Sequence, residues 1–188
     1  MQIYIDFISG RVYQFDIDNT PASKYTYTIG QNASAVTLGN TTTRTLLHSI
    51  TIPKGTLTTG DSVKVLFSFT CNNNANTKTI SAGINGSATS FGVISGTAHT
   101  GGIMECTIKV ASLTQVNAIN TSNNSSYGLT NLASPRTYTI SNINSNDFTI
   151  DIYGQKVTAG TDTLILEHAI GIIQKSYGKI FCSRYGNQ

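Results

Sequence analysis

The segment RTLLHSITIPKGTLTTGDSVKVLFSFTCNNNANTKTISAGI, residues 44–84, decides the fold. Within it, between Ser62 and Cys71, every second residue is large and apolar: Val63, Val65, Phe67 and Phe69. Successive side chains of a β-strand point to opposite faces, so this spacing predicts a strand with one buried face.

Two apolar runs flank this strand and end at residues that stop or turn a chain. Leu46 to Ile52 ends at Pro53, which has no N–H to donate to a sheet. After Cys71, the polar stretch Asn72 to Asn76 turns the chain, which returns along Thr77 to Ile84. Runs and breaks at this spacing predict three consecutive antiparallel strands.

The same pattern continues toward the C-terminus. Further strands are predicted at Ser90–Ile94, Gly102–Ala111, Arg136–Ile140, Asp147–Tyr153 and Leu164–Ile173. Residues 118–133 are rich in Asn and Ser and predict a long loop, with a short strand near Tyr127 to Leu132. No amphipathic helix is indicated. We therefore expect an all-β protein, an antiparallel β-sandwich or jelly roll of about eight strands.

The N-terminal region carries its own signal. Alternating runs on either side of Ser9-Gly10 predict a β-hairpin. From Asn19 to Thr43 the chain is polar and punctuated by glycine and proline, which favours a linker or arm. We expect a hairpin and arm over residues 1–40, a sandwich domain over 41–175 and an aromatic tail over 176–188. In the alternative, the hairpin completes the same domain.

The composition favours a protein that works through contacts. Thr occurs 28 times, Ser 19 and Asn 17 in 188 residues, whereas charged residues make up only 11%. These small hydrogen-bonding residues suit strands and turns better than helix interiors. The length suits one domain with its own core.

The charge distribution argues against nucleic acid as a partner. The net charge is +3, and most lysines are scattered singly. The densest basic stretch is the C-terminal tail, where Lys175, Lys179 and Arg184 alternate with aromatic residues. Three cations supply few phosphate contacts, so we expect no nucleic-acid binding.

The sequence contains no feature expected of export or membrane insertion. The first residues lack a basic stretch and place Asp6 in the apolar run. The longest apolar run, Thr163 to Ile173, is interrupted by charge and is shorter than the roughly 20 residues that span a bilayer. Cys71, Cys106 and Cys182 have no metal-ligand spacing, and their odd number predicts reduced thiols. We expect folding in a reducing cytosol.

Catalytic and metal-binding patterns are also lacking. His48, His99 and His168 stand apart in the sequence, so no metal site is expected. Glu105 and Glu167 are the only glutamates, and their pattern predicts two solvent-facing strand residues. No GxSxG nucleophile turn and no phosphate-binding glycine loop occurs. We therefore expect no enzyme activity and no cofactor.

One part of the chain resembles a known class of module. Residues 41–61, with the Ile52-Pro53-Lys54-Gly55-Thr56-Leu57 turn and the Gly60-Asp61 pair, look like the opening of small jelly-roll modules in tailed-bacteriophage virion proteins. The later pieces Asp147–Ile150 and Leu164–Glu167 resemble their closing strands. The resemblance covers about Thr41 to Lys175.

The resemblance implies a non-enzymatic virion part made in the host bacterial cytoplasm. It would be a capsid decoration or head-fibre protein, or otherwise a tail-fibre or baseplate module. It would be a homo-oligomer, commonly a trimer, that contacts capsid or tail subunits. Interfaces favour buried aromatic residues, so the candidate assembly residues are Tyr4, Phe7, Tyr13, Phe15, Tyr177, Phe181 and Tyr185.

The alternative is a carbohydrate- or host-receptor-binding β-sandwich module. Loops rich in Asn, Thr, Tyr and Gly supply groups that hydrogen-bond to sugars or stack on them. Tyr127 is the candidate ligand contact, and a glycan of the host surface would be the partner. Both functions are compatible if a virion part touches the host.

Overall fold

A computed structural model describes residues 2–6, 11–15, 26–121, 130–133 and 135–176, with side chains for 26–121 and 135–176. Every regular element in these residues is a β-strand. The strands are β1 (Gln2–Asp6), β2 (Arg11–Phe15), β3 (Thr26–Ile29), β4 (Val36–Thr37), β5 (Thr45–Ile52), β6 (Ser62–Cys71), β7 (Lys78–Ile84), β8 (Ser90–Gly96), β9 (Gly101–Ser112), β10 (Gln115–Asn120), β11 (Thr130–Ala133), β12 (Arg136–Thr139), β13 (Phe148–Lys156) and β14 (Leu164–Gln174).

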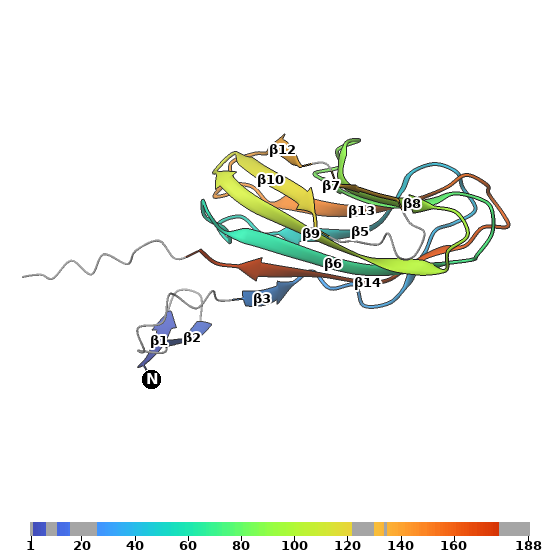
Figure 1. Cartoon of the computed structure of the whole chain (residues 1–188). Coiled ribbons are helices and arrows are strands. Elements are labelled where there is room, and N and C mark those ends of the chain that lie inside the picture. Colours follow the sequence, from blue (N-terminus) through green and yellow to red (C-terminus); the bar gives the residue numbers. More distant parts are fainter. Residues whose placement is uncertain (1, 7–10, 16–25, 122–129, 134, 177–188) are drawn as a thin grey trace, which may run out of the picture.

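Two antiparallel sheets face each other as the layers of a sandwich (Figure 1). The larger sheet has seven strands in the order β12-β10-β9-β6-β14-β3, with β4 also paired to β14. The smaller sheet has the order β11-β8-β7-β13-β5. The all-β prediction is therefore confirmed. The described residues contain no helix long and apolar enough to cross a membrane.

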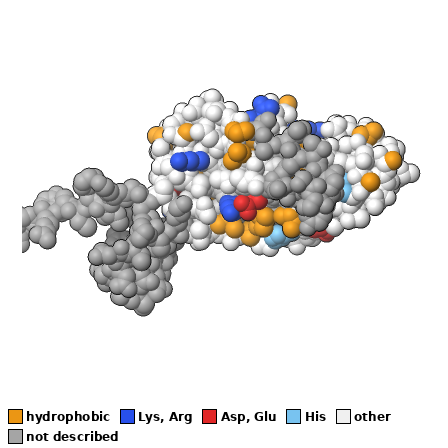
Figure 2. Space-filling view, in the orientation of Figure 1, with side chains coloured by type: hydrophobic (Ala, Val, Ile, Leu, Met, Phe, Trp, Pro, Cys, Tyr) orange, Lys and Arg blue, Asp and Glu red, His pale blue; other side chains and the backbone are white. Residues whose placement is uncertain are grey.

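The core lies between the two layers and is built by alternation. On β9, Met104 is fully buried whereas Ile103 is 55% exposed. On β6, the four alternating residues of the sequence prediction are all buried: Val63, Val65, Phe67 and Phe69. The opposing layer supplies Ile50, Ile80 and Ile150 to the same apolar cluster. Figure 2 shows that few charged side chains lie on the face in view, as the composition predicts.

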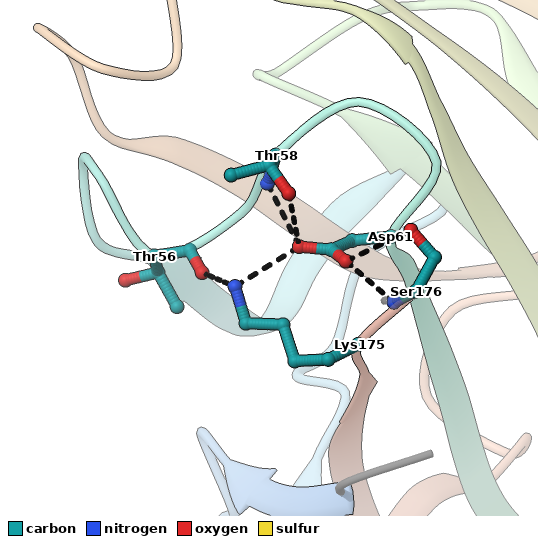
Figure 3. A network of polar contacts seen from close by, with 5 residues as sticks. All are labelled: Thr56, Thr58, Asp61, Lys175 and Ser176. Atoms are coloured by element: carbon teal, nitrogen blue, oxygen red, sulfur yellow. Dashed lines mark hydrogen bonds and ion pairs between the residues drawn. The ribbon is translucent and has the colours of Figure 1, made fainter. Parts of the chain in front are cut away.

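One buried carboxylate fixes the entry to β6 (Figure 3). Asp61 Oδ2 accepts hydrogen bonds from the Thr58 N–H at 2.8 Å and from Lys175 Nζ at 2.9 Å. Its Oδ1 accepts from the Ser176 N–H at 2.7 Å. The β5–β6 connection is thereby tied to the chain that leaves β14.

The expected number of strands was too low, because three strands have weak signals. β3 and β4 lie in the range 1–40 that was expected to be a hairpin, arm or linker, yet both pair with β14. On β3 only Tyr27 and Ile29 pack on the core, which is too short an alternation to stand out. β10 extends to Asn120, so the loop predicted over residues 118–133 was wrong at its first three residues; the buried face of this strand includes the polar Asn120, which weakens its apolar pattern.

The N-terminal hairpin is confirmed as a separate two-stranded sheet in which β1 and β2 pair antiparallel. Gln2 lies opposite Phe15, and Tyr4 lies opposite Tyr13. Its use as an attachment arm, and that of residues 176–188 as a tail, stay predictions.

Candidate functional site

An open pocket of about 460 Å³ lies where an edge strand of the larger sheet meets a turn of the smaller one. One wall is Ser87 and Thr89, in the connection between β7 and β8. The other wall is residues 135–139, which include all of β12. Hydroxyl groups and a guanidinium thus line a shared depression.

The β7–β8 turn that forms the first wall has a defined shape. Asn85 and Gly86 have φ values of 50° and 70°, and the Ser87 N–H donates to the Ile84 carbonyl at 2.9 Å. Two consecutive positive φ values belong to the tight hairpin turn that favours an Asn-Gly pair. Only Asn, Asp and Gly adopt this conformation readily, so the two residues position Ser87.

A buried carboxylate accepts a hydrogen bond from the backbone of this turn. Asp151 of β13 is almost inaccessible to solvent, and its Oδ2 accepts from the Gly86 N–H at 2.6 Å. Its Oδ1 accepts from Ser49 Oγ at 2.6 Å. The Thr149 N–H donates to Asn85 Oδ1 at 2.7 Å. The turn is therefore fixed to the neighbouring strand β13.

Arg44 braces the same wall through its guanidinium. Its Nη2 donates to the Ser87 carbonyl at 3.3 Å and to Ser90 Oγ at 3.4 Å. The guanidinium also stacks over the Tyr153 ring. Burial and the nearby Asp151 raise the pKa of Tyr153, while Arg44 acts in the opposite direction. The phenol consequently stays protonated at neutral pH.

The second wall is tied to the first by side chains of β12. Arg136 Nε donates to the Ser90 carbonyl, and Tyr138 Oη donates to the Thr89 carbonyl, both at 2.9 Å. The Tyr138 ring meets Phe91 edge to face, with centroids 6.1 Å apart. Burial raises the pKa of Tyr138, so its hydroxyl remains a donor. Two hydrogen bonds and one ring contact thus tie the two walls of the pocket together.

The lining has a simple chemistry. It contains hydroxyl groups, one guanidinium, one aromatic ring and a proline, and none of its members is Asp, Glu, His, Cys or Lys. General acid–base catalysis needs a side chain that exchanges protons near neutral pH. The lining offers hydrogen bonds, a positive charge and a ring face or edge, which are means of binding.

The site residues predicted from sequence lie elsewhere. Tyr4, Tyr13 and Phe15 are on the hairpin strands, where the backbone alone is described. The other candidates fall outside the described residues: Phe7, Tyr127, Tyr177, Phe181 and Tyr185. Their roles in assembly or ligand contact stay predictions.

The two glutamates take part in surface contacts. Glu105 forms an ion pair with Lys64, with 3.0 Å between Oε1 and Nζ. Glu167 accepts a hydrogen bond from Thr70 Oγ1. Both side chains lie on the solvent side of the larger sheet, as the alternation predicts.

Sequence reasoning missed the pocket, although part of its signal was present. Asn85-Gly86 between two apolar runs is a strong hairpin signal. Arg136 and Tyr138 alternate on a predicted strand. That these segments, about fifty positions apart, lie side by side follows only from the sheet order.

Neither a family model nor a curated protein matches the chain. Among solved structures, it is similar to winged bean acidic lectin complexed with methyl-α-D-galactose, at 9% identity and a TM-score of 0.34, over 82% of this chain and 100% of the lectin. It is also similar to the CBM2 module of Lactobacillus casei BL23 phage J-1 evolved Dit, at 10% identity and a TM-score of 0.38, over 84% of this chain and 100% of the module. A third is Eiger TNF from S. frugiperda, at 9% identity and a TM-score of 0.32, over 83% and 95% of the two chains. Likenesses this distant assign the chain to no family.

Proposed function

We propose that the chain is a carbohydrate-binding β-sandwich module and that the pocket between β12 and the β7–β8 turn receives the sugar. The observation that carries the proposal is the lining. Ser87, Thr89 and Thr139 line the pocket beside a single guanidinium, that of Arg136, and the hydroxyl of Thr137 donates to Asn117 Oδ1. Sugars present many hydroxyl groups that both donate and accept, and such a lining matches them.

The size and preorganisation of the pocket support the same function. A volume of about 460 Å³ falls within the usual range of small-ligand sites, roughly 300–1,000 Å³. Arg44, Asp151 and Tyr138 hold the walls through hydrogen bonds within the protein. A wall that is already ordered loses little conformational freedom when a ligand binds.

The positive charge narrows the class of sugar. Arg136 is exposed at the pocket, and no carboxylate lies among the lining residues. A guanidinium pairs with carboxylate or phosphate through parallel hydrogen bonds. A glycan bearing an acidic sugar should therefore bind more tightly than its neutral counterpart.

The test is a glycan array probed with the full chain, followed by calorimetry on the best glycan and its neutral analogue. Arg136→Ala should weaken binding of the acidic glycan about tenfold, which corresponds to roughly 1.4 kcal/mol. Lys109→Ala removes an exposed cation from the outer face of the larger sheet and is the matched control. Absence of saturable binding, or equal loss with both variants, would contradict the proposal.

A structural role in a bacteriophage virion is the second candidate, and the two functions are compatible. It is favoured by the resemblance over residues 41–175. The strand boundaries agree with that pattern, because β5 ends at Ile52 just before Pro53 and β6 begins directly after Asp61. The chain would then be a non-enzymatic capsid-associated or tail module, located in the virion.

Solution mass tests the virion role. The full chain is compared by light scattering with a variant lacking residues 1–25, a deletion that spares β3 because this strand begins at Thr26. A stable trimer near three times 20.1 kDa supports assembly into a symmetric virion part. A monomer that also fails to attach to phage particles would contradict it.

A further inference from the structure

A buried lysine, an asparagine amide and a buried carboxylate meet at the end of the sandwich where β6 turns into β7. Lys78 is the first residue of β7 and is only 1% exposed. Asn74 lies in the preceding turn, and Asp162 lies in the β13–β14 connection and is 2% exposed. Lysine and aspartate are rarely buried this completely unless something offsets the lost hydration.

The contacts among the three side chains follow a sequence. Lys78 Nζ donates to Asn74 Oδ1. Asn74 Nδ2 donates to Asp162 Oδ1 at 2.7 Å. The amine therefore lies against the carbonyl side of the amide, while the carboxylate holds its nitrogen.

We propose that Lys78 and Asn74 are joined by an intramolecular isopeptide bond, formed in the folded chain with Asp162 as the proton carrier. The inference concerns a covalent modification site and is independent of sugar binding. The two partners are a nucleophile and an amide in contact, and Lys78 is buried whereas Asn74 is partly exposed.

The reaction balances without any oxidant or cofactor. Lys78 Nζ gives up a proton and its lone pair attacks Cγ of Asn74, forming the Nζ–Cγ bond. The Cγ–Nδ2 bond then breaks, and Nδ2 leaves. The lysine ammonium has three protons. One stays on the nitrogen of the new amide, and the other two are transferred to Nδ2. The leaving group therefore departs as an ammonium ion.

Asp162 is placed to carry the proton. Its Oδ1 accepts from the amide that must become the leaving group and from Asn76 Nδ2 at 3.0 Å. Its Oδ2 is buried and has no hydrogen-bond partner among the described residues. The hydrogen bond from Asn74 lowers the pKa of Asp162, so the carboxylate is ionised in the folded chain and can accept the proton that the ammonium gives up.

Backbone groups hold the amide and can stabilise the charge that develops on it. The Asn76 N–H donates to Asn74 Oδ1 at 3.0 Å, which is the oxygen that becomes negative when Cγ is attacked. The Ala98 N–H donates to the Asn74 carbonyl at 2.7 Å and fixes the turn to the β8–β9 connection. The electrophile is thus positioned before the reaction.

A lysine–carboxylate contact elsewhere in the sandwich shows why the partner of the lysine must be an amide. Lys175 Nζ lies 2.9 Å from Asp61 Oδ2, but its side chain is 29% exposed and its partner is an ionised carboxylate. A carboxylate anion is a poor electrophile and carries no amide nitrogen to release. Lys175 and Asp61 therefore remain an ion pair, and this lysine serves as the internal control.

Mass spectrometry of the intact, purified full chain tests the proposal. The wild type should be lighter than its amino-acid sequence requires by the mass of one ammonia molecule. Lys78→Arg, Asn74→Ala and Asp162→Asn should each have the mass that their sequences require. Lys175→Met should retain the loss. A wild-type mass equal to that of the unmodified chain would overturn the proposal, whether or not the variants fold.

Trypsin digestion locates the bond. Cleavage after Lys78 requires a free side chain, so the wild type should release residues 65–109 as one uncut peptide that has lost ammonia, because this range contains no other lysine or arginine before Lys109. Asn74 can also lose ammonia alone by forming a cyclic imide with its own backbone. In that case trypsin still cuts after Lys78, and this result would likewise overturn the proposal.

Discussion

The guanidinium carbon of Arg44 lies 3.4 Å from the centroid of the Tyr153 ring. Arg44 precedes β5, whereas Tyr153 belongs to β13, the strand paired with it. From this position the same guanidinium donates to the carbonyl of Ser87 in the pocket wall. One stacked contact thus links the smaller sheet to the candidate sugar site.

Arg44→Ala should destabilise the fold and weaken sugar binding together. The variant loses a cation–π contact and a charge-assisted hydrogen bond, for a total of about 1–3 kcal/mol in the free energy of unfolding. Urea denaturation measures the first effect and calorimetry with the array-selected glycan the second. Arg44→Lys keeps the charge but lacks the planar guanidinium, so its stability and its sugar affinity should lie between those of the wild type and Arg44→Ala. Unchanged binding in Arg44→Ala would show that the wall does not depend on this brace.

Tyr138→Phe should separate the hydroxyl of Tyr138 from its ring. The ring contact with Phe91 remains, while the hydrogen bond to the Thr89 carbonyl is lost, at a cost of about 0.5–1.5 kcal/mol in stability. Tyr138→Ala removes both and should cost more, about 2–3 kcal/mol, because the ring is only partly buried. Equal stability of the two variants in urea titrations would contradict this division.

Stability should depend on Asp61 at acid pH. Burial by itself raises the pKa of Asp61, but hydrogen bonds from Thr58, Lys175 and Ser176 outweigh burial and hold the pKa below its ordinary value of 3.8. A carboxyl whose pKa is lower in the folded state stabilises the fold above its unfolded pKa. That contribution is lost as pH falls below about 3.8 toward the folded value.

Denaturation of wild type and Asp61→Asn at several pH values checks this. The variant should be less stable by about 2–4 kcal/mol at pH 7, because the side chain at position 61 loses its charge-assisted hydrogen bonds. The difference between the two proteins should shrink as the pH is lowered past 3.8. A difference that stays constant with pH would contradict the assignment.

Two neighbouring residues of β9 test the alternation directly. Met104→Lys places a charge in the core and should prevent cooperative folding or cost more than about 4 kcal/mol. Ile103→Lys, on the exposed face, should change stability by about 0.5 kcal/mol or less. Thermal melts followed by circular dichroism give both values, and similar losses in the two would mean that both faces are covered.

The cysteines of the core should be unreactive. Burial raises the pKa of the Cys71 and Cys106 thiols above the ordinary 9.0, and the thiolate is the reactive form. Cys71 Sγ also lies 3.1 Å from His99 Nδ1, and its thiol donates to the His99 carbonyl at 3.3 Å. In a Cys182→Ser variant, iodoacetamide at pH 8 should label neither thiol of the folded protein and both in urea. Rapid labelling of the folded form would show that the core opens.

The sequence by itself determined the class of fold and the faces of its strongest strands. Period-two alternation from Ser62 to Cys71 and from Gly102 to Ala111 predicts which side chains are buried, and the bounds of β6 agree at both ends. This succeeds because burial of one face is a local property, expressed at every second residue. The Asn85-Gly86 pair before β8 is also a local turn signal, although the prediction did not use it.

Only the tertiary structure decided which distant segments meet. β3 and β4 pair with β14 across more than a hundred residues, although their own sequences have little apolar pattern. The pocket likewise joins Ser87 to Arg136, and the buried cluster joins Lys78 to Asp162. Such contacts depend on sheet order and loop placement, which arise from the packing of the whole core. The sequence of a single segment does not specify which distant segments it will pair with or pack against.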